Sequence, residues 1–202
     1  MGSFEGMQII LGQNQFPRKN DMHILKCNFD GYASFLFKST EDDLKWGKGW
    51  FDGVSKGVAY PVPEGVRNVA GPENRSDIMP DFTHIGLAPI PTFSMRAIQA
   101  LGSMLSEHGE LAPIKMDEPV QYYGFNPTII LDLLDEDQSQ ITYFSSGKIM
   151  AIDHYVLRKT GIRLPPIFKI PQTRVNKTYV SEEFIARVNE CKLTGFRFQP
   201  LP

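Results

Sequence analysis

Only two stretches of this chain carry the apolar spacing of an α-helix. In residues 92–108 the side chains of Ile98, Leu101 and Leu105 fall on one face. In residues 181–192 a second stripe consists of Phe184, Ile185, Val188 and Cys191. Elsewhere the apolar runs are short and are separated by many of the 17 glycines and 15 prolines. Few helices and many short strands, without strict alternation, predict an α+β fold of mostly antiparallel short strands with two main helices.

Both predicted helices have recognisable ends. Thr92 or Ser94 can cap the first helix, and Gly109 can end it. At the start of the second helix Ser181 can accept hydrogen bonds from free amides, and the glutamates that follow it complement the helix dipole. We therefore expect these helices at about 92–108 and 181–192.

Short runs of apolar, β-branched and aromatic residues mark the expected strands. These runs are 7–11, 22–28, 33–38, 111–116, 121–125, 128–133, 167–170, 178–180 and 196–199. Residues 141–144 and 148–157 flank a Ser-Ser-Gly turn and predict a hairpin. Residues 41–81 are so rich in Gly and Pro that they predict turns and long surface connections.

Three aromatic residues lie in this Gly-rich region, namely Trp46, Trp50 and Phe51. They can cap the core from a loop, or they can stand exposed as anchors of a protein interface. The first arrangement is the commoner one, and both remain open from the sequence.

The composition is that of an ordinary globular protein. The 202 residues include 42% hydrophobic and 22% charged residues, with a net charge of -2, which argues against bulk binding to nucleic acid or to an anionic membrane. The longest apolar runs are far shorter than the roughly 20 residues of a membrane helix. The first residues lack the basic and apolar regions of a signal peptide, so a cytoplasmic location is expected. Cys27 and Cys191 are too few for a disulfide framework and are expected to be reduced.

The small net charge hides two adjacent segments of opposite sign. Between Met116 and Gly147 the sequence has six carboxylates and no Lys or Arg, and the six are Asp117, Glu118, Asp132, Asp135, Glu136 and Asp137. Between His154 and Ser181 it has six cations and no Asp or Glu. These segments can pair with each other or stay solvated. Alternatively, one of them can form a docking surface that steers and orients a partner protein.

A search for catalytic chemistry finds only weak candidates. The sequence has no phosphate loop, dinucleotide fingerprint, nucleophile elbow or zincin pattern. His23 and Cys27 would lie about 13 Å apart along a strand, which is too far for direct proton transfer. Asp153-His154, Glu107-His108 and the acidic run at 135–137 lack the spacing of a metal site. We therefore predict no catalytic residues, no cofactor and no metal.

From residue 87 to 201 the order of several short motifs resembles a known family. The motifs are Pro91-Thr92-Phe93-Ser94-Met95-Arg96-Ala97, His108-Gly109-Glu110-Leu111-Ala112-Pro113, Tyr122-Tyr123, Asn126, Asp132-Leu133-Leu134-Asp135, Ser139, Gly147-Lys148-Ile149, Tyr155, Pro166-Ile167-Phe168-Lys169-Ile170-Pro171, Val180-Ser181-Glu182-Glu183-Phe184 and Leu193-Thr194-Gly195-Phe196-Arg197-Phe198. This order resembles the bacterial polymorphic-toxin immunity proteins of class eleven. The resemblance implies an immunity region at 87–202, preceded by a variable strand- and loop-rich region at 1–86, or one compact domain overall.

The resemblance also implies a function. A protein of this family would bind the effector domain of a cognate secreted toxin encoded by a neighbouring gene, and so protect the producing cell. Many such toxins are delivered by contact-dependent or type VI secretion. The family offers no established catalytic residues. We expect neutralisation by occlusion, with Asp132, Asp135, Glu136 and Asp137 as the toxin-binding residues and Asp117 and Glu118 as their neighbours. The alternatives are an uncharacterised small enzyme and an adaptor of a secretion system.

Overall fold

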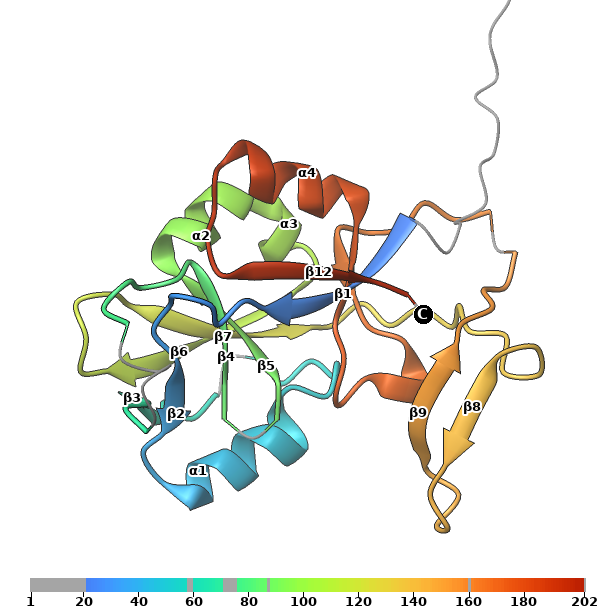
Figure 1. Ribbon diagram of the computed structural model, residues 1–202, viewed down its shortest axis with the longest axis horizontal. Helices are drawn as coiled ribbons and strands as arrows, with labels where there is room; N and C mark the ends of the chain where they lie inside the picture. Colours follow the sequence, from blue (N-terminus) through green and yellow to red (C-terminus); the bar gives the residue numbers. More distant parts are fainter. Residues whose placement is uncertain (1–20, 58–59, 71–75, 87, 160, 202) are drawn as a thin grey trace, which may run out of the picture.

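A computed structural model describes residues 21–57, 60–70, 76–86, 88–159 and 161–201. Its largest feature is a closed barrel with the strand order β2-β3-β6-β7-β5-β4 (Figure 1). These strands are β2 (Phe35–Phe37), β3 (Glu64–Arg67), β4 (Phe82–Ile85), β5 (Ile90–Ser94), β6 (Gly109–Met116) and β7 (Tyr122–Pro127). Most pairs are antiparallel, whereas β2 with β4 and β3 with β6 are parallel.

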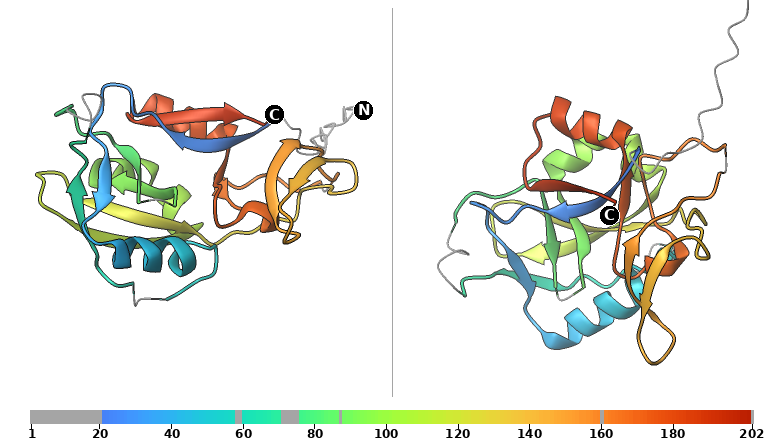
Figure 2. Two further views of the ribbon diagram at one scale, coloured as in Figure 1. Left: turned by 60° about the horizontal axis from the view of Figure 1, so that its bottom comes forward. Right: turned by 45° about the vertical axis from the view of Figure 1, so that its right-hand side comes forward.

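Two smaller sheets adjoin the barrel. An antiparallel sheet has the order β10-β11-β1-β12, and a separate hairpin pairs β8 with β9. The strands are β1 (Met22–Cys27), β8 (Gln140–Tyr143), β9 (Ile149–His154), β10 (Ile167–Phe168), β11 (Tyr179–Ser181) and β12 (Phe196–Pro200). The hairpin projects from one end of the molecule, as the views in Figures 1 and 2 agree.

The helices are short. They are α1 (Thr40–Lys45), which continues into a π-helical turn η2 (Trp46–Trp50), α2 (Met95–Leu101), α3 (Ser103–Ser106), the 3-10 turn η4 (Pro171–Thr173) and α4 (Glu182–Glu190). The expected α+β class is confirmed, although the sequence did not predict a closed barrel. None of the described helices has the length and apolar character needed to cross a membrane.

The first predicted helix, 92–108, is wrong at both ends. Residues 92–94 belong to β5, because Thr92 pairs with Gly124 of β7. The helix begins at Met95, where the Ser94 hydroxyl accepts from the Ala97 amide at 3.1 Å, and Gly102 with φ +49° divides it into α2 and α3. Gly109 does not end the helix but opens β6.

The second predicted helix is confirmed as α4, with Ser181 at its N-cap position and two glutamates in its first turn. The Ser181 hydroxyl makes no capping hydrogen bond, contrary to expectation.

The strand predicted at residues 128–133 does not form. Instead, the backbone of this segment makes isolated hydrogen bonds to Lys169. The Leu131 amide donates to the Lys169 carbonyl, and the Lys169 amide donates to the Ile129 carbonyl. The predicted strand at 7–11 lies outside the described residues.

The Gly-rich region is more structured than the sequence predicts, since it contains α1, η2 and β3. Trp46 and Phe51 are buried with the apolar side chains of the barrel, and Trp50 packs against them. Of the two alternatives for these aromatic residues, the core arrangement is the one found.

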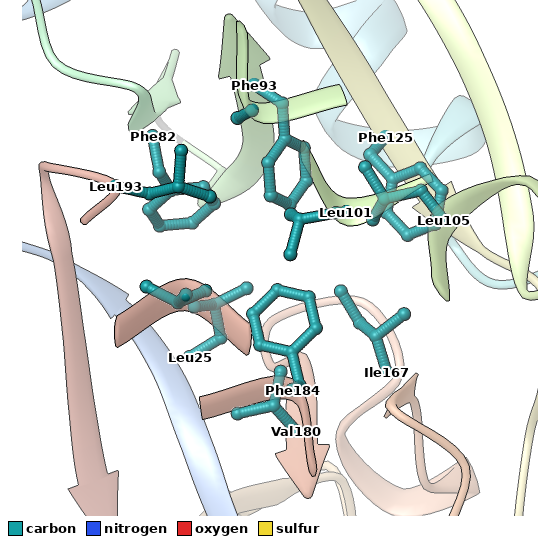
Figure 3. Packing of buried hydrophobic residues seen from close by; sticks show 12 residues of the cluster. Leu25, Phe82, Phe93, Leu101, Leu105, Phe125, Ile167, Val180, Phe184 and Leu193 are labelled. Carbon is teal, nitrogen blue, oxygen red and sulfur yellow. The ribbon is translucent and has the colours of Figure 1, made fainter. Parts of the chain in front are cut away.

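Three apolar clusters hold the elements together. One fills the barrel around Trp46 and Phe51, and a second lies beneath the hairpin. The third joins the barrel to the β1 sheet, where Phe82 and Phe93 face Leu25 and Phe184 (Figure 3). The barrel takes three strands from before residue 86 and three from after it, so the two regions expected at 1–86 and 87–202 share one barrel.

Candidate protein-interaction site

The six predicted toxin-binding carboxylates fall into two groups. Asp117 and Glu118 follow β6, at the connection to β7, whereas the other four precede β8. These two connections lie at opposite ends of the long axis in Figures 1 and 2. Asp117 and Glu118 are therefore not neighbours of the other four residues, because β7 carries the chain along the length of the barrel between them.

In the barrel-end group Glu118 forms an ion pair, whereas Asp117 is exposed. Glu118 accepts hydrogen bonds from the Nε and Nη2 atoms of Arg67 at 2.9 and 2.8 Å. Nearby, Glu64 pairs with both Lys115 and Lys38, and these two cations lower the pKa of Glu64 to about 2. The charge at this end is thus largely compensated within the protein.

Three residues of the second group form what we call the acidic turn, Asp135 to Asp137. Asp135 stabilises the turn itself, because its carbonyl accepts from the Ser139 amide at 2.9 Å and its Oδ1 atom from the Gln138 amide at 3.2 Å. Glu136 is exposed and accepts from Gln172 at 2.7 Å, and Asp137 is exposed. The turn therefore presents Glu136 and Asp137 outward.

The oppositely charged segments pair with each other only once among the residues described. Asp132 binds Arg158 at 2.6 Å. Arg163 instead binds Glu183 of α4 at 2.8 Å. Lys177 donates to the hydroxyl of Tyr155 at 3.0 Å. Mutual pairing thus accounts for one of the four acidic positions at this end.

The hairpin next to the acidic turn exposes large apolar side chains that were not predicted from the sequence. Tyr143, Phe144 and Met150 are 49, 52 and 53% exposed. Ile152 of the same hairpin is buried in the second cluster, and Ile141 and Ile149 pack against that cluster. The sequence signal for this surface was the pair of consecutive aromatic residues before the Ser-Ser-Gly turn. Because neighbouring strand residues point to opposite faces, the two rings could not both face the core.

A thiol and an imidazole also meet, in a pairing the sequence did not predict. Cys27 Sγ lies 3.4 Å from Nδ1 of His84, whereas His23 is four residues away on the same strand. Burial raises the pKa of Cys27 to about 11 and lowers that of His84 to about 4. Both groups are then neutral near pH 7, unlike the thiolate–imidazolium pair of an activated nucleophile. Cys191 is a second free cysteine.

A cavity of about 330 Å³ separates α3 from the start of α4. Glu107, His108, Arg163 and Glu183 are among its lining residues, and Nδ1 of His108 is buried without a hydrogen-bond partner. Arg163 and Glu183 already pair with each other. In the part of the chain that is described, no three His, Cys, Asp or Glu side chains are grouped to hold a metal ion.

Comparison with known proteins adds no identification. No protein-family model matches the sequence, and a search among curated proteins finds no match.

Proposed function

We propose that this protein is an immunity protein that binds the effector domain of a cognate secreted toxin and neutralises it stoichiometrically by occlusion. The observation that carries the proposal is the surface at the hairpin end, where Tyr143, Phe144 and Met150 are exposed on the hairpin that follows the acidic turn in the chain. Occlusion needs a shaped surface and no chemistry.

The side chains at this surface are of the kind that dominates protein interfaces. Aromatic residues and methionine are enriched there because they bury much apolar area. The outward carboxylates Glu136 and Asp137 would steer a basic partner and set its orientation. A toxin acting on nucleic acid would supply such a basic surface.

The motif residues behind the resemblance occupy structural positions. Phe168 and Phe184 are buried in two of the clusters, and Gly195 has φ +83° in the turn before β12. Asn126 is likewise buried and hydrogen-bonded to the barrel's own loop. These motif residues therefore build the fold, whereas Tyr143, Phe144 and Met150 lie outside the motifs.

The test is co-expression with the toxin domain encoded by the neighbouring gene. The proposal expects rescued growth, a stable 1:1 complex and loss of toxin activity. A Tyr143→Ala/Phe144→Ala variant should bind roughly 100-fold more weakly, since each lost anchor is worth on the order of 1–2 kcal/mol. Phe29→Ala removes an equally exposed aromatic residue elsewhere and is the matched control.

Charge reversal tests the acidic turn separately. Glu136→Lys/Asp137→Lys leaves the hydrogen bonds of Asp135 and the Asp132–Arg158 pair in place. Weaker binding and a smaller salt dependence would support steering by this turn. Unchanged affinity and salt dependence after reversal of all four residues, Asp132 and Asp135 included, would exclude it.

The cavity beside His108 is the observation that favours a second candidate, a small enzyme. It combines an orphaned imidazole nitrogen with carboxylates, a combination found at acid–base sites. If the neighbouring gene product neither binds nor poisons cells, activity screening of wild type against His108→Gln becomes the deciding experiment. An adaptor would bind a secretion component without rescuing growth.

A further inference from the structure

A groove of about 500 Å³ runs between the start of β9 and the η4 turn. The hairpin contributes Lys148 and Ile149, and the turn contributes residues 171–176. Figure 1 shows the η4 turn beside β9. The groove therefore lies at the same end of the molecule as the exposed hairpin.

Two cations on the groove lack anionic partners. Lys148 on one wall and Arg174 on the other are exposed, and neither side chain forms an ion pair with any described residue. By contrast, Lys38, Arg67 and Arg158 each bind a carboxylate. The groove thus has an uncompensated positive charge.

A buried acceptor in the groove is also unsatisfied. The amide nitrogen of Gln172 donates to Glu136 at 2.7 Å, whereas its Oε1 atom is buried without a partner. A buried acceptor without a donor costs free energy. Ile149, Pro171 and Val175 supply apolar contact surface.

The wall that carries Arg174 is fixed from within. The buried amine of Lys169 donates to the Arg174 carbonyl at 2.5 Å, and the Thr173 hydroxyl bonds to the Tyr179 hydroxyl at 2.7 Å. A groove held in this way loses little conformational entropy on binding.

We infer that this groove binds an acidic segment of the partner protein. A carboxylate would lie between Lys148 and Arg174, and the aliphatic part of the side chain would contact Val175. The inference rests on the proposed function for the identity of the partner. It adds that the interface has two poles, with the acidic turn and the basic groove joined by Gln172, so that only one orientation of the toxin satisfies both.

The first experiment needs no toxin. The pentapeptide Ac-Ala-Glu-Leu-Glu-Ala-amide and its Gln analogue are titrated into the labelled full chain, followed by NMR. The inference expects shifts at residues 148–149 and 172–176 with the acidic peptide only, abolished in Lys148→Glu/Arg174→Glu. Equal shifts with the Gln analogue, or shifts elsewhere, would overturn it.

The second experiment uses the toxin domain. Lys148→Glu/Arg174→Glu should weaken binding by roughly tenfold or more, whereas the control Lys192→Glu/Arg197→Glu, which reverses exposed cations on the α4–β12 side, should not. Equal affinity of the groove variant and wild type contradicts the inference alone. If the wild type does not bind the toxin domain, the proposed function is contradicted. The peptide titration then still tests whether the groove binds an acidic segment. Circular dichroism and thermal unfolding of each variant exclude misfolding.

Discussion

Glu110 and Asn126 stand directly opposite each other across β6 and β7, and both side chains hold the connection that follows η2. The Glu110 carboxylate accepts from the amides of Lys56 and Gly57 at 2.9 and 3.1 Å. Asn126 accepts from the Gly53 amide at 2.9 Å. Two facing positions on one strand pair thus fix a loop that lies far earlier in the chain.

Glu110→Gln is therefore expected to destabilise the protein by about 1–3 kcal/mol, because the neutral amide is a weaker acceptor and its NH₂ group faces backbone donors. Chemical denaturation measures this, and hydrogen exchange should become faster at residues 53–57. Glu107→Gln, an exposed change on the preceding turn, is the control. If both variants unfold alike, the carboxylate does not stabilise the loop.

Local sequence patterns were sufficient for the elements whose partners are close in the chain. The β8–β9 hairpin follows from two apolar runs around Gly147, and α4 follows from its apolar stripe. The barrel depends on pairings such as Phe35 with Ile85 and Glu64 with Lys115, each a short parallel contact between distant segments. Nothing in either segment alone encodes the partner, so the closed barrel could not be predicted.

The candidate site was predictable only in part. The run of carboxylates identified the acidic turn, but a count of charges cannot tell Asp135, which bonds its own turn, from Asp137, which faces solvent. The count of charges also grouped Glu118 with residues at the opposite end of the molecule. These residues are near in the sequence, but the extended strand β7 separates them in space. Lys148 and Arg174 became visible only once η4 was placed beside β9.

The stability of the protein should fall between about pH 6.5 and pH 4 because of His84. Burial beside Cys27 lowers the pKa of His84 to about 4, so the unfolded chain takes up a proton in this range that the folded protein does not. The loss attributable to this residue is about 1–2 kcal/mol, discounted because the ring is partly exposed. His84→Asn should flatten the curve of unfolding free energy against pH. Identical acid dependence in wild type and His84→Asn would refute the assignment.

Lys169 predicts a gain of stability at alkaline pH. Burial lowers its pKa to about 8, so as the pH rises from 8 to 10.5 the folded protein releases a proton that the unfolded chain still holds. Wild type should therefore gain on the order of 2–3 kcal/mol relative to Lys169→Met across this interval. The measurement is the difference in unfolding free energy between the two proteins at about pH 7.5, 9 and 10.5. Lys159→Met, which removes an exposed amine, should stay parallel to the wild type, and a constant difference for Lys169→Met would contradict the prediction.

Gly195 lies where the barrel meets the β1 sheet, and this contact leaves no room for a side chain. The Gly195 carbonyl accepts from the Asn28 amide at 2.8 Å, and a Cβ atom would stand 2.1 Å from the carbonyl oxygen of Phe82. Because φ is +83° and the obstruction is backbone, Gly195→Ala should cost about 3 kcal/mol or more.

Gly31→Ala separates the two causes. Gly31 has nearly the same φ, +78°, but nothing lies within 4 Å of the place that a Cβ atom would take, so this variant should lose only about 1 kcal/mol from the backbone conformation. Thermal and denaturant unfolding of both variants give the comparison. Because the turn before β12 joins the barrel to the sheet, Gly195→Ala should also shift the near-ultraviolet circular dichroism of the aromatic cluster around Phe82 and Phe196. Equal destabilisation by the two substitutions would mean that φ alone, and not the close approach of the two sheets, explains the glycine.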